Sequence, residues 1–594
     1  MFASRAGATG GLWCYSDAPM RTSSCLASAF LALLTVTAAC GSNKSKGSGF
    51  DDSPDGGPTG SDDSGSPTMM TGDTGMGFGP GQADSSPTPM QTTVATCAQA
   101  ATTHSYIGCD YWPTSVANAV WSIFDFAVAV ANTQSTPAMI TVTGPNSFSQ
   151  TTTVAPGQLA KIYLPWNAAL KGPDADNCGS AMPLANTIFS TGGAYHLVSS
   201  VPVTVYQFNA LEYAGMGGPS GKSWAACPGN TSCPEDLGPI GCYSFSNDAS
   251  LLLPSTAMTG NYRVMGIYSQ PGQGGPGLGS YFAVTGTQAG TTVEVTLSNT
   301  AAAAAGGQIQ AASGGGTLTF TLNAGDVAEV IGTATGMDDF SGSLLKASKP
   351  VQVIGGISCI ALPLNNPLAG SCDHIEESVF PAETLGKHYV VTVPTSPSGQ
   401  PVGHVVRFYG NANGTTLTYS PSAPAGCPIT LSAGQVVDCG DSSGYTSTSF
   451  EVTGTHEFGV GSFQLSAGLV DNNPADTMQQ GDPSMSFAAA VEQYRTSYIF
   501  LAPTDYAVNY VDVTVSPGTT LKLDGSPVST APETIDSSFS VVRLTLPNGS
   551  ANGAHTLTGN NPFGIQVLGY GAYTSYQYPG GLDLAQIAPP PTNN

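Results

Sequence analysis

The chain has 594 residues, more than a single hydrophobic core accommodates, so several domains are expected. Its 39 acidic and 15 basic residues leave a formal net charge of −24, which excludes nucleic acid as a favourable partner. Hydrophobic residues make up 41% of the chain, which argues against disorder in the main body. Glycine (74) and proline (44) are frequent and disfavour helix interiors, so the composition predicts an all-β protein.

The beginning of the chain has the layout of a bacterial export signal followed by a cysteine. We interpret residues 1–19 as a misassigned start and residues 20–39 as the signal peptide. One positive charge, an apolar run and small residues precede Cys40, a pattern that predicts lipidation of Cys40, although Thr37 stands where leucine is usual. The alternatives are ordinary cleavage after Ala39 and a transmembrane helix. The helix is disfavoured because the apolar run is shorter than the ~20 residues a bilayer requires.

Residues 40–96 consist almost entirely of serine, glycine, aspartate, proline and threonine, without apolar periodicity. This composition predicts a disordered acidic linker that tethers the rest of the chain. Its aspartates lack the ordered spacing of a calcium loop, so we interpret them as part of a solvated spacer.

Beyond the linker the sequence repeats itself weakly, about four times, as stacked copies of one structural unit do. We expect tandem β-sandwich-like units at residues 97–245, 246–372, 373–480 and 481–585, and a disordered tail at residues 586–594. Units of this length suit a sandwich. A four-bladed propeller is the alternative, disfavoured because propeller blades have only ~45 residues.

Two recurring signals support the repeat. A tyrosine follows eight residues after Pro254, Pro381 and Ala490. A strand-rich phrase, with proline in three of its four copies, occurs at residues 195–206, 344–354, 450–460 and 555–565. Proline there suits a strand edge or the start of a strand, because it donates no backbone hydrogen bond.

A third signal lies between these two. Strands with alternating apolar residues are followed by short turns whose glycine permits a positive φ. The turns stand at residues 154–158, 322–326 and 431–435, and the fourth unit has no clear match.

Ten cysteines follow Cys40, and an even number in an exported chain predicts disulfides. Short spacing favours three local pairs, whereas the other four cysteines pair among themselves in an order that remains open. The local pairs are Cys97–Cys109, Cys359–Cys372 and Cys427–Cys439, and the remaining four are Cys178, Cys227, Cys233 and Cys242. Zinc binding is disfavoured because no C-x-x-C spacing occurs and the compartment is oxidising.

Several phrases together resemble one family. They are GCDYWP (108–113), YQFN (206–209), SNDASLLLP (246–254), CDHIEE (372–377), GDP (481–483) and VEQYR (491–495). These phrases resemble the IgGFc-binding protein N-terminal domain family, found among others in bacterial surface proteins, over about residues 97–585. The resemblance implies an extracellular module. The family name refers to antibody-Fc binding by an animal member. No residue of this sequence can be assigned to such binding.

The densest polar cluster of the chain is Asp373, His374, Glu376 and Glu377. Such residues could hold a metal ion or act as acid and base. They could equally anchor a junction between units, with the acids accepting hydrogen bonds from backbone or from Arg and Lys. We favour the junction, because spacing alone specifies no ligand geometry. The sequence therefore predicts no catalytic residue, no metal site and no cofactor.

These observations predict a lipoprotein of the bacterial cell envelope, at the outer membrane and facing the exterior. Its expected role is adhesion to an extracellular protein or glycan, with membrane contact through the lipid anchor only. A structural surface or matrix component without a specific ligand is the first alternative. A carbohydrate-active enzyme is the second, and it requires two carboxylates facing one cleft. We expect the chain not to be an enzyme.

Overall fold

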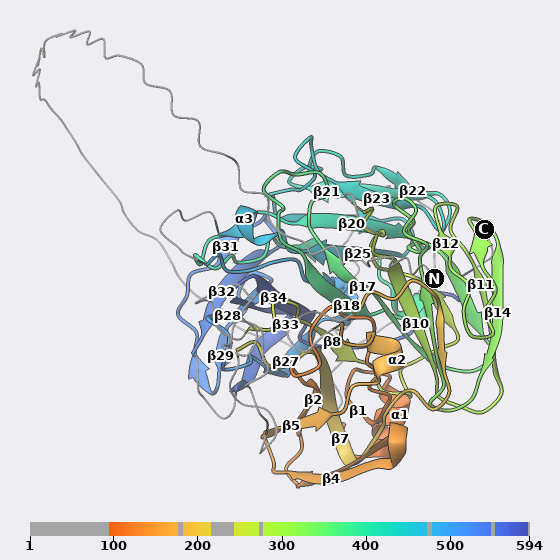
Figure 1. Ribbon diagram of the computed structural model, residues 1–594. Coiled ribbons are helices and arrows are strands. Elements are labelled where there is room, and N and C mark those ends of the chain that lie inside the picture. The colour runs from red at the N-terminus through yellow and green to blue at the C-terminus, as the bar shows by residue number, and fades with distance from the viewer. Residues whose placement is uncertain are drawn as a thin grey trace, which may run out of the picture. The chain divides into compact units, whose positions relative to one another are not determined.

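The computed structural model describes residues 94–175, 182–214, 222, 243–272, 277–471, 478–547 and 553–591. The expected signal peptide, Cys40 and nearly all of the expected linker lie outside these residues. Antiparallel strands dominate the described part, so the prediction of an all-β fold is confirmed (Figure 1).

The first unit is built around one long strand, β7. Its amino-terminal half pairs with β3 and its carboxyl-terminal half with β2, so β7 belongs to two sheets. The sheet order is β4-β3-β7-β2-β5, with β1 and β8 also paired to β7. The elements are α1 (Cys97–Thr103), β1 (Gly108–Tyr111), β2 (Phe126–Ala131), β3 (Ala138–Gly144), η1 (Pro145–Ser147), β4 (Phe148–Val154), β5 (Leu159–Leu164), α2 (Ala168–Lys171), β6 (Ile188–Ser190), β7 (His196–Asn209) and β8 (Asp248–Leu252).

The second unit has a five-stranded sheet of order β18-β17-β10-β15-β6 and a four-stranded sheet of order β14-β11-β16-β9. The edge strand β6 comes from the first unit's part of the chain and pairs with β15 of the second. Outward positions of β11 and β14 alternate with buried apolar ones, as expected of a sandwich wall. The elements are β9 (Asn261–Arg263), β10 (Ser280–Gly286), β11 (Thr291–Thr296), β12 (Ala302–Ala303), β13 (Ala312–Ser313), β14 (Thr317–Leu322), β15 (Val327–Ile331), β16 (Leu344–Ala347), β17 (Val351–Ile360), β18 (Asp373–Ser378) and η3 (Ala382–Thr384).

The third unit pairs two four-stranded sheets, β19-β24-β21-β22 and β23-β20-β25-β26, around an apolar core of its own. The elements are β19 (His388–Val391), β20 (Val405–Gly410), β21 (Thr415–Ser420), β22 (Thr430–Leu431), β23 (Val436–Cys439), β24 (Phe450–Gly454), β25 (Phe458–Phe463), α3 (Ala467–Val470), β26 (Met485–Phe487) and η4 (Val491–Gln493).

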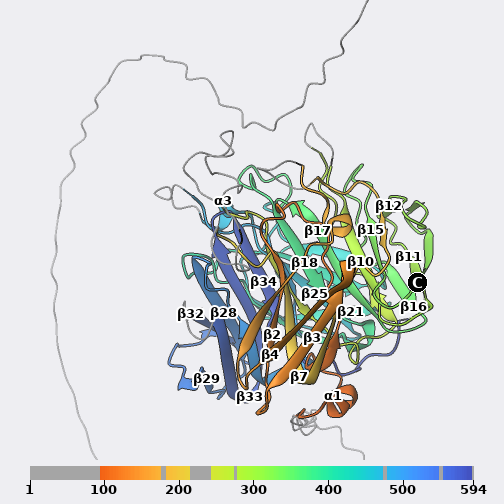
Figure 2. The ribbon, with the colours of Figure 1, turned by 60° about the horizontal axis from the view of Figure 1, so that its bottom comes forward.

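The fourth unit, like the first, is built around one long strand that belongs to two sheets. Its 18-residue strand β33 pairs with β27 and β29 in one half and with β28 and β34 in the other. The elements are β27 (Arg495–Leu501), β28 (Val508–Val515), β29 (Leu521–Leu523), β30 (Ser526–Pro527), β31 (Glu533–Thr534), β32 (Ser540–Leu546), β33 (Ala554–Gly571) and β34 (Thr574–Pro579). Figure 2 shows the orange strands β2 and β3 and the yellow strand β7 beside the blue strands of this unit, and the Tyr206 hydroxyl donates to the Ile499 carbonyl across that contact.

Three strands that follow an expected unit boundary pair with a strand that precedes it. β8 pairs with β7, β18 with β17 and β26 with β25, although the boundaries expected at residues 246, 373 and 481 assign each of them to the following unit. The connections that precede β8, β18 and β26 span residues 210–247, 361–372 and 464–484. Because of these intervening residues, the local sequence pattern groups each strand with the strands that follow it.

The recurring tyrosine forms a hydrogen bond with the recurring phrase. In every unit a buried tyrosine hydroxyl donates to the carbonyl at the point where the chain passes from one sheet of the sandwich to the other. The pairs are Tyr111 and Val203 (2.6 Å), Tyr262 and Val351 (2.6 Å), Tyr389 and Phe458 (2.5 Å), and Tyr498 and Phe563 (2.5 Å). In three units the acceptor directly follows the proline of the phrase, so one hydrogen bond connects two of the repeat's signals.

The turn glycines of the third signal also adopt the expected conformation. Gly157, Gly325 and Gly434 have φ values of 66°, 82° and 74°. A side chain with a Cβ would be strained there, which is why the sequence repeats glycine at these turns.

Candidate functional site

The last strand of each unit lies at the centre of the described body. β8 contacts both β18 and β34, and β26 contacts the same two strands. In Figure 1 the labels β8, β18 and β34 stand close together although the strands come from distant parts of the chain. The predicted polar cluster lies on β18, so the four units meet around it.

One carboxylate from the first unit connects all four of these strands. The Oδ1 atom of Asp248 accepts hydrogen bonds from the backbone N–H groups of Ala249 (2.9 Å) and Gln577 (3.2 Å). Its Oδ2 atom accepts from those of Glu376 (3.1 Å) and Met485 (3.0 Å). Asp248 therefore satisfies buried donors on β8, β34, β18 and β26 with a single side chain.

Glu376 makes the reciprocal contact from the second unit to the first. Its Oε1 atom accepts from Gln207 Nε2 (3.1 Å) and Ser250 Oγ (3.0 Å), and its Oε2 atom accepts from Asn209 Nδ2. All three donors are neutral side chains of β7 and β8, and Glu376 itself is 0% exposed. The carboxylate thus stabilises the packing of the second unit on the first.

Glu377 and Asp373 accept hydrogen bonds in the same manner. Glu377 Oε1 accepts from the N–H of Leu251 (3.0 Å), and Asp373 Oδ2 accepts from Thr574 Oγ1 (2.7 Å) and the N–H of Ser575 (3.2 Å). Burial raises the pKa of both carboxyl groups well above the usual range. Asp373 therefore attaches β18 to β34, and Glu377 attaches it to β8.

His374 completes the cluster and is buried in the protein interior. It is 0% exposed, and neither ring nitrogen has a hydrogen-bond partner among the described residues. Its Nε2 atom lies 3.6 Å from Glu376 Oε2, and its ring stacks on Tyr281 at 6.5 Å between centroids. The His374 side chain is therefore shielded from solvent. In the described part of the chain, no three His, Cys, Asp or Glu side chains are arranged to hold a metal ion.

A further buried carboxyl group, Asp482, precedes β26. Its Oδ1 atom accepts from Ser371 Oγ (2.8 Å) and the N–H of Ala467 (2.9 Å), whereas its buried Oδ2 atom has no partner in the described residues. Burial raises its pKa from the ordinary 3.8 to about 7. The protein therefore has to keep this group protonated, or pay for a buried charge, near neutral pH.

We expect the stability of this junction to fall as pH rises. Because the folded-state pKa of Asp482 exceeds the unfolded value, its favourable contribution is fully present below about pH 4 and is lost as pH rises through about 7. Asp482→Asn keeps the Oδ1 acceptor and removes the ionisation. Urea unfolding at pH 4 and pH 8 measures the free energy of unfolding of both proteins. The difference between variant and parent is expected to shift in favour of the variant by at least about 1 kcal/mol from pH 4 to pH 8. An unchanged difference between the two pH values would contradict the assignment.

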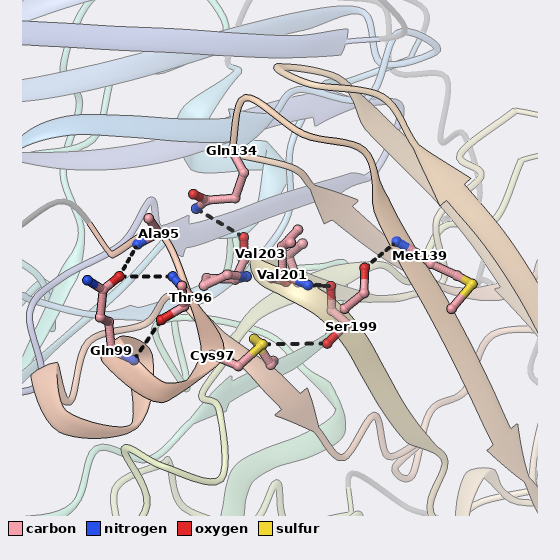
Figure 3. Close-up of a disulfide and its surroundings, with 12 residues drawn as sticks. Ala95, Thr96, Cys97, Gln99, Gln134, Met139, Ser199, Val201 and Val203 are labelled. Carbon is pink, nitrogen blue, oxygen red and sulfur yellow. Dashed lines mark hydrogen bonds between the residues drawn. A yellow bond between two sulfur atoms is a disulfide. The ribbon is translucent and has the colours of Figure 1, made fainter.

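Three disulfides lie in the described residues and join the three pairs expected from spacing. They are Cys97–Cys109, Cys359–Cys372 and Cys427–Cys439, whereas Cys178, Cys227, Cys233 and Cys242 lie outside the described residues. Figure 3 shows Cys97 beside the Ser199 carbonyl, with Thr96 and Gln99 capping the helix that carries it. The first disulfide thus attaches α1 to β1 at the side of β7.

Two central residues, Asp248 and Asp482, were not recognised as site residues in the sequence. Asp248 opens β8 as Asp373 opens β18, and Asp482 stands three residues before β26. An aspartate at or just before the last strand of three successive units is the signal that identifies them. Their partners on other units lie far away in the sequence, Met485 237 residues from Asp248 and Ser371 111 residues from Asp482, so local pattern does not show them.

Comparison with known proteins locates the similarity in the later units. The sequence pattern of the family described as IgGFc binding protein matches residues 248–569, more than half of the chain, from the first residue of β8 into β33. A segment of 191 residues, 32% of the chain, is 31% identical to human IgGFc-binding protein and spans 3% of that protein's length. No solved structure matches the chain. The match is shorter than the expected 97–585 and omits most of the first unit.

The helices of the described residues are short. None of them combines the length and the apolar character that crossing a membrane takes.

Proposed function

The chain belongs to the IgGFc-binding protein family, and from this membership we propose that it recognises an extracellular protein or glycan. The matched residues 248–569 begin at the aspartate that connects all four units and include most of the central junction. The observation that carries the proposal is the family match itself, which covers more than half of the chain and includes β8, β18 and β26 of the central junction. The human relative is named for binding immunoglobulin Fc, and an Fc-like protein is one candidate partner.

The burial of the central acids supports recognition over catalysis. Asp248, Asp373, Glu376 and Glu377 are each 0% exposed and accept hydrogen bonds from backbone or neutral side chains. A carbohydrate-active enzyme needs two carboxylates that reach a substrate in one cleft. These four carboxylates face the protein interior, so we propose that the chain is not an enzyme.

Two tests address the proposed recognition directly. Purified full chain is applied to a glycan array and, by biolayer interferometry, to immobilised immunoglobulin Fc and a panel of extracellular matrix proteins. Saturable binding to at least one of them is expected, with loss of binding after the chain is reduced and heated. Absence of saturable binding to every glycan and protein would favour the alternative of a structural surface component without a specific ligand.

We also propose that the protein is exported and held at the outside of a bacterial cell envelope, at the outer membrane, by a lipid on Cys40. The disulfides of the described residues support an oxidising compartment. Cys40→Ser is expected to move most of the protein from the membrane fraction to the soluble fraction, and Cys25→Ser serves as the matched control. An unchanged distribution of the Cys40 variant would contradict lipid anchoring.

A further inference from the structure

A cleft of about 380 Å³ opens where the second and third units meet. One wall comes from loops of the second unit and includes Asn299 and Met337, and the other comes from β23 and the turn before it. Asn299 is exposed, and the Met337 side chain is 50% exposed. Ligand sites are commonly found at such junctions between domains. We call this feature the interunit cleft.

The cleft has a rigid polar side formed by Arg407 and two carboxylates. Arg407 Nε and Nη2 donate to the two oxygens of Asp438 (2.6 and 3.1 Å), and Nη1 donates to Asp339 Oδ2 (2.9 Å). The guanidinium also lies 4.9 Å from the centroid of the Tyr268 ring. Bidentate pairing and stacking hold all four side chains in one geometry, so a ligand meets preorganised groups.

The charges and hydrogen-bonding groups of the cleft restrict what it can bind. One positive and two negative side chains leave a net negative charge in a chain whose formal net charge is −24, which repels anions. The Asp438 side chain is 36% exposed, and its carboxylate has acceptor capacity beyond the two bonds from Arg407. The Asn299 amide both donates and accepts, and Met337 offers an apolar surface.

We propose that the interunit cleft binds one neutral hexose unit of a glycan, an inference that rests on the proposed recognition function. A hexose presents hydroxyl groups that donate and accept on its edge and C–H groups on its face. The hydroxyls match Asp438 and Asn299, and the C–H face matches Met337. A cleft of this volume holds one sugar ring rather than a folded protein surface, and its charge selects against uronic and sialic acids.

Saturation-transfer NMR with the purified full chain and glucose, galactose or mannose tests this inference. Transfer to the ring protons of at least one neutral hexose is expected, with none to glucuronic acid. Asn299→Ala and Met337→Ala are each expected to weaken the affinity at least about fivefold, as loss of a single favourable contact does. Gln150→Ala, on the exposed strand β4 of the first unit, removes an amide elsewhere and should leave binding unchanged.

The outcomes separate this inference from the function on which it rests. No transfer to any neutral hexose, or transfer that the two cleft variants leave unchanged, overturns the cleft assignment. If the chain then still binds an extracellular protein, the proposed recognition stands and only the sugar site fails. Preferential transfer to glucuronic acid also overturns the assignment, because the charge argument predicts the reverse. Circular dichroism and thermal unfolding of each variant establish that it is folded.

Discussion

Asp248→Ala is expected to lower the free energy of unfolding by about 4 kcal/mol or more. The substitution leaves four buried backbone N–H groups, on Ala249, Glu376, Met485 and Gln577, without an acceptor. Each buried unsatisfied donor costs about 1–3 kcal/mol. The cost is concentrated at the junction, because the four donors belong to four different units. Urea unfolding followed by intrinsic fluorescence measures it, and hydrogen exchange of β18, β26 and β34 locates it.

Two comparisons make the Asp248 experiment specific. In Asp248→Asn the side chain keeps nearly the same shape, but an NH₂ group replaces one of the two acceptor oxygens. That group then faces two backbone N–H donors, so the variant should not restore the stability of the parent. Asp338→Ala is the control: that half-buried aspartate accepts from Thr333 Oγ1 (2.5 Å), and its loss should cost no more than about 1 kcal/mol. If Asp248→Ala is as stable as this control, the central carboxylate does not hold the units together.

Arg407→Ala is expected to lower the free energy of unfolding by about 3–5 kcal/mol, because it removes the guanidinium that two carboxylates of different units, Asp339 and Asp438, share. The Arg407 side chain is 4% exposed and that of Asp339 is 12% exposed, so the loss leaves an unpaired buried charge on the second unit. Arg407→Lys should recover only part of the loss, since an ammonium cannot pair with both oxygens of Asp438 while reaching Asp339.

The matched control for Arg407 is Lys522→Ala, which removes a cation from an exposed position of β29. A change within about 0.5 kcal/mol is expected for that surface substitution. Guanidinium unfolding would screen the ion pairs, so urea at low ionic strength is the appropriate denaturant. Equal stability of Arg407→Ala and Lys522→Ala would show that the pairing between the second and third units contributes nothing measurable.

The tyrosine repeat shows how far the sequence could predict the fold. The constant step of eight residues before Tyr262, Tyr389 and Tyr498 marks one structural position, and the structure shows the hydrogen bond that requires it. The first unit keeps the bond through Tyr111, which the step did not reveal because no matching proline phrase precedes it. The local geometry around this tyrosine is thus similar enough from unit to unit that it could be recognised in the sequence.

The polar cluster shows the limit of the same approach. Asp373, His374, Glu376 and Glu377 stand together in the sequence, so they are conspicuous as a group. Their partners are not: Glu376 accepts from Gln207 and Ser250, which precede it by 169 and 126 residues. Because no local pattern encodes such a pairing, the sequence left a metal site, a catalytic pair and a junction as alternatives.

Features that depend on neighbouring residues could thus be predicted from the sequence. They are the all-β character, the repeat, the turn glycines and the three local disulfides. Alternation, φ preference and short spacing act over a few residues, so they leave a pattern that can be read without coordinates. The assignment of β8, β18 and β26 to their sheets, and the convergence of all four units on Asp248, follow from packing between distant segments. A buried donor is satisfied by whichever acceptor the assembled units bring to it, and that choice is made in three dimensions.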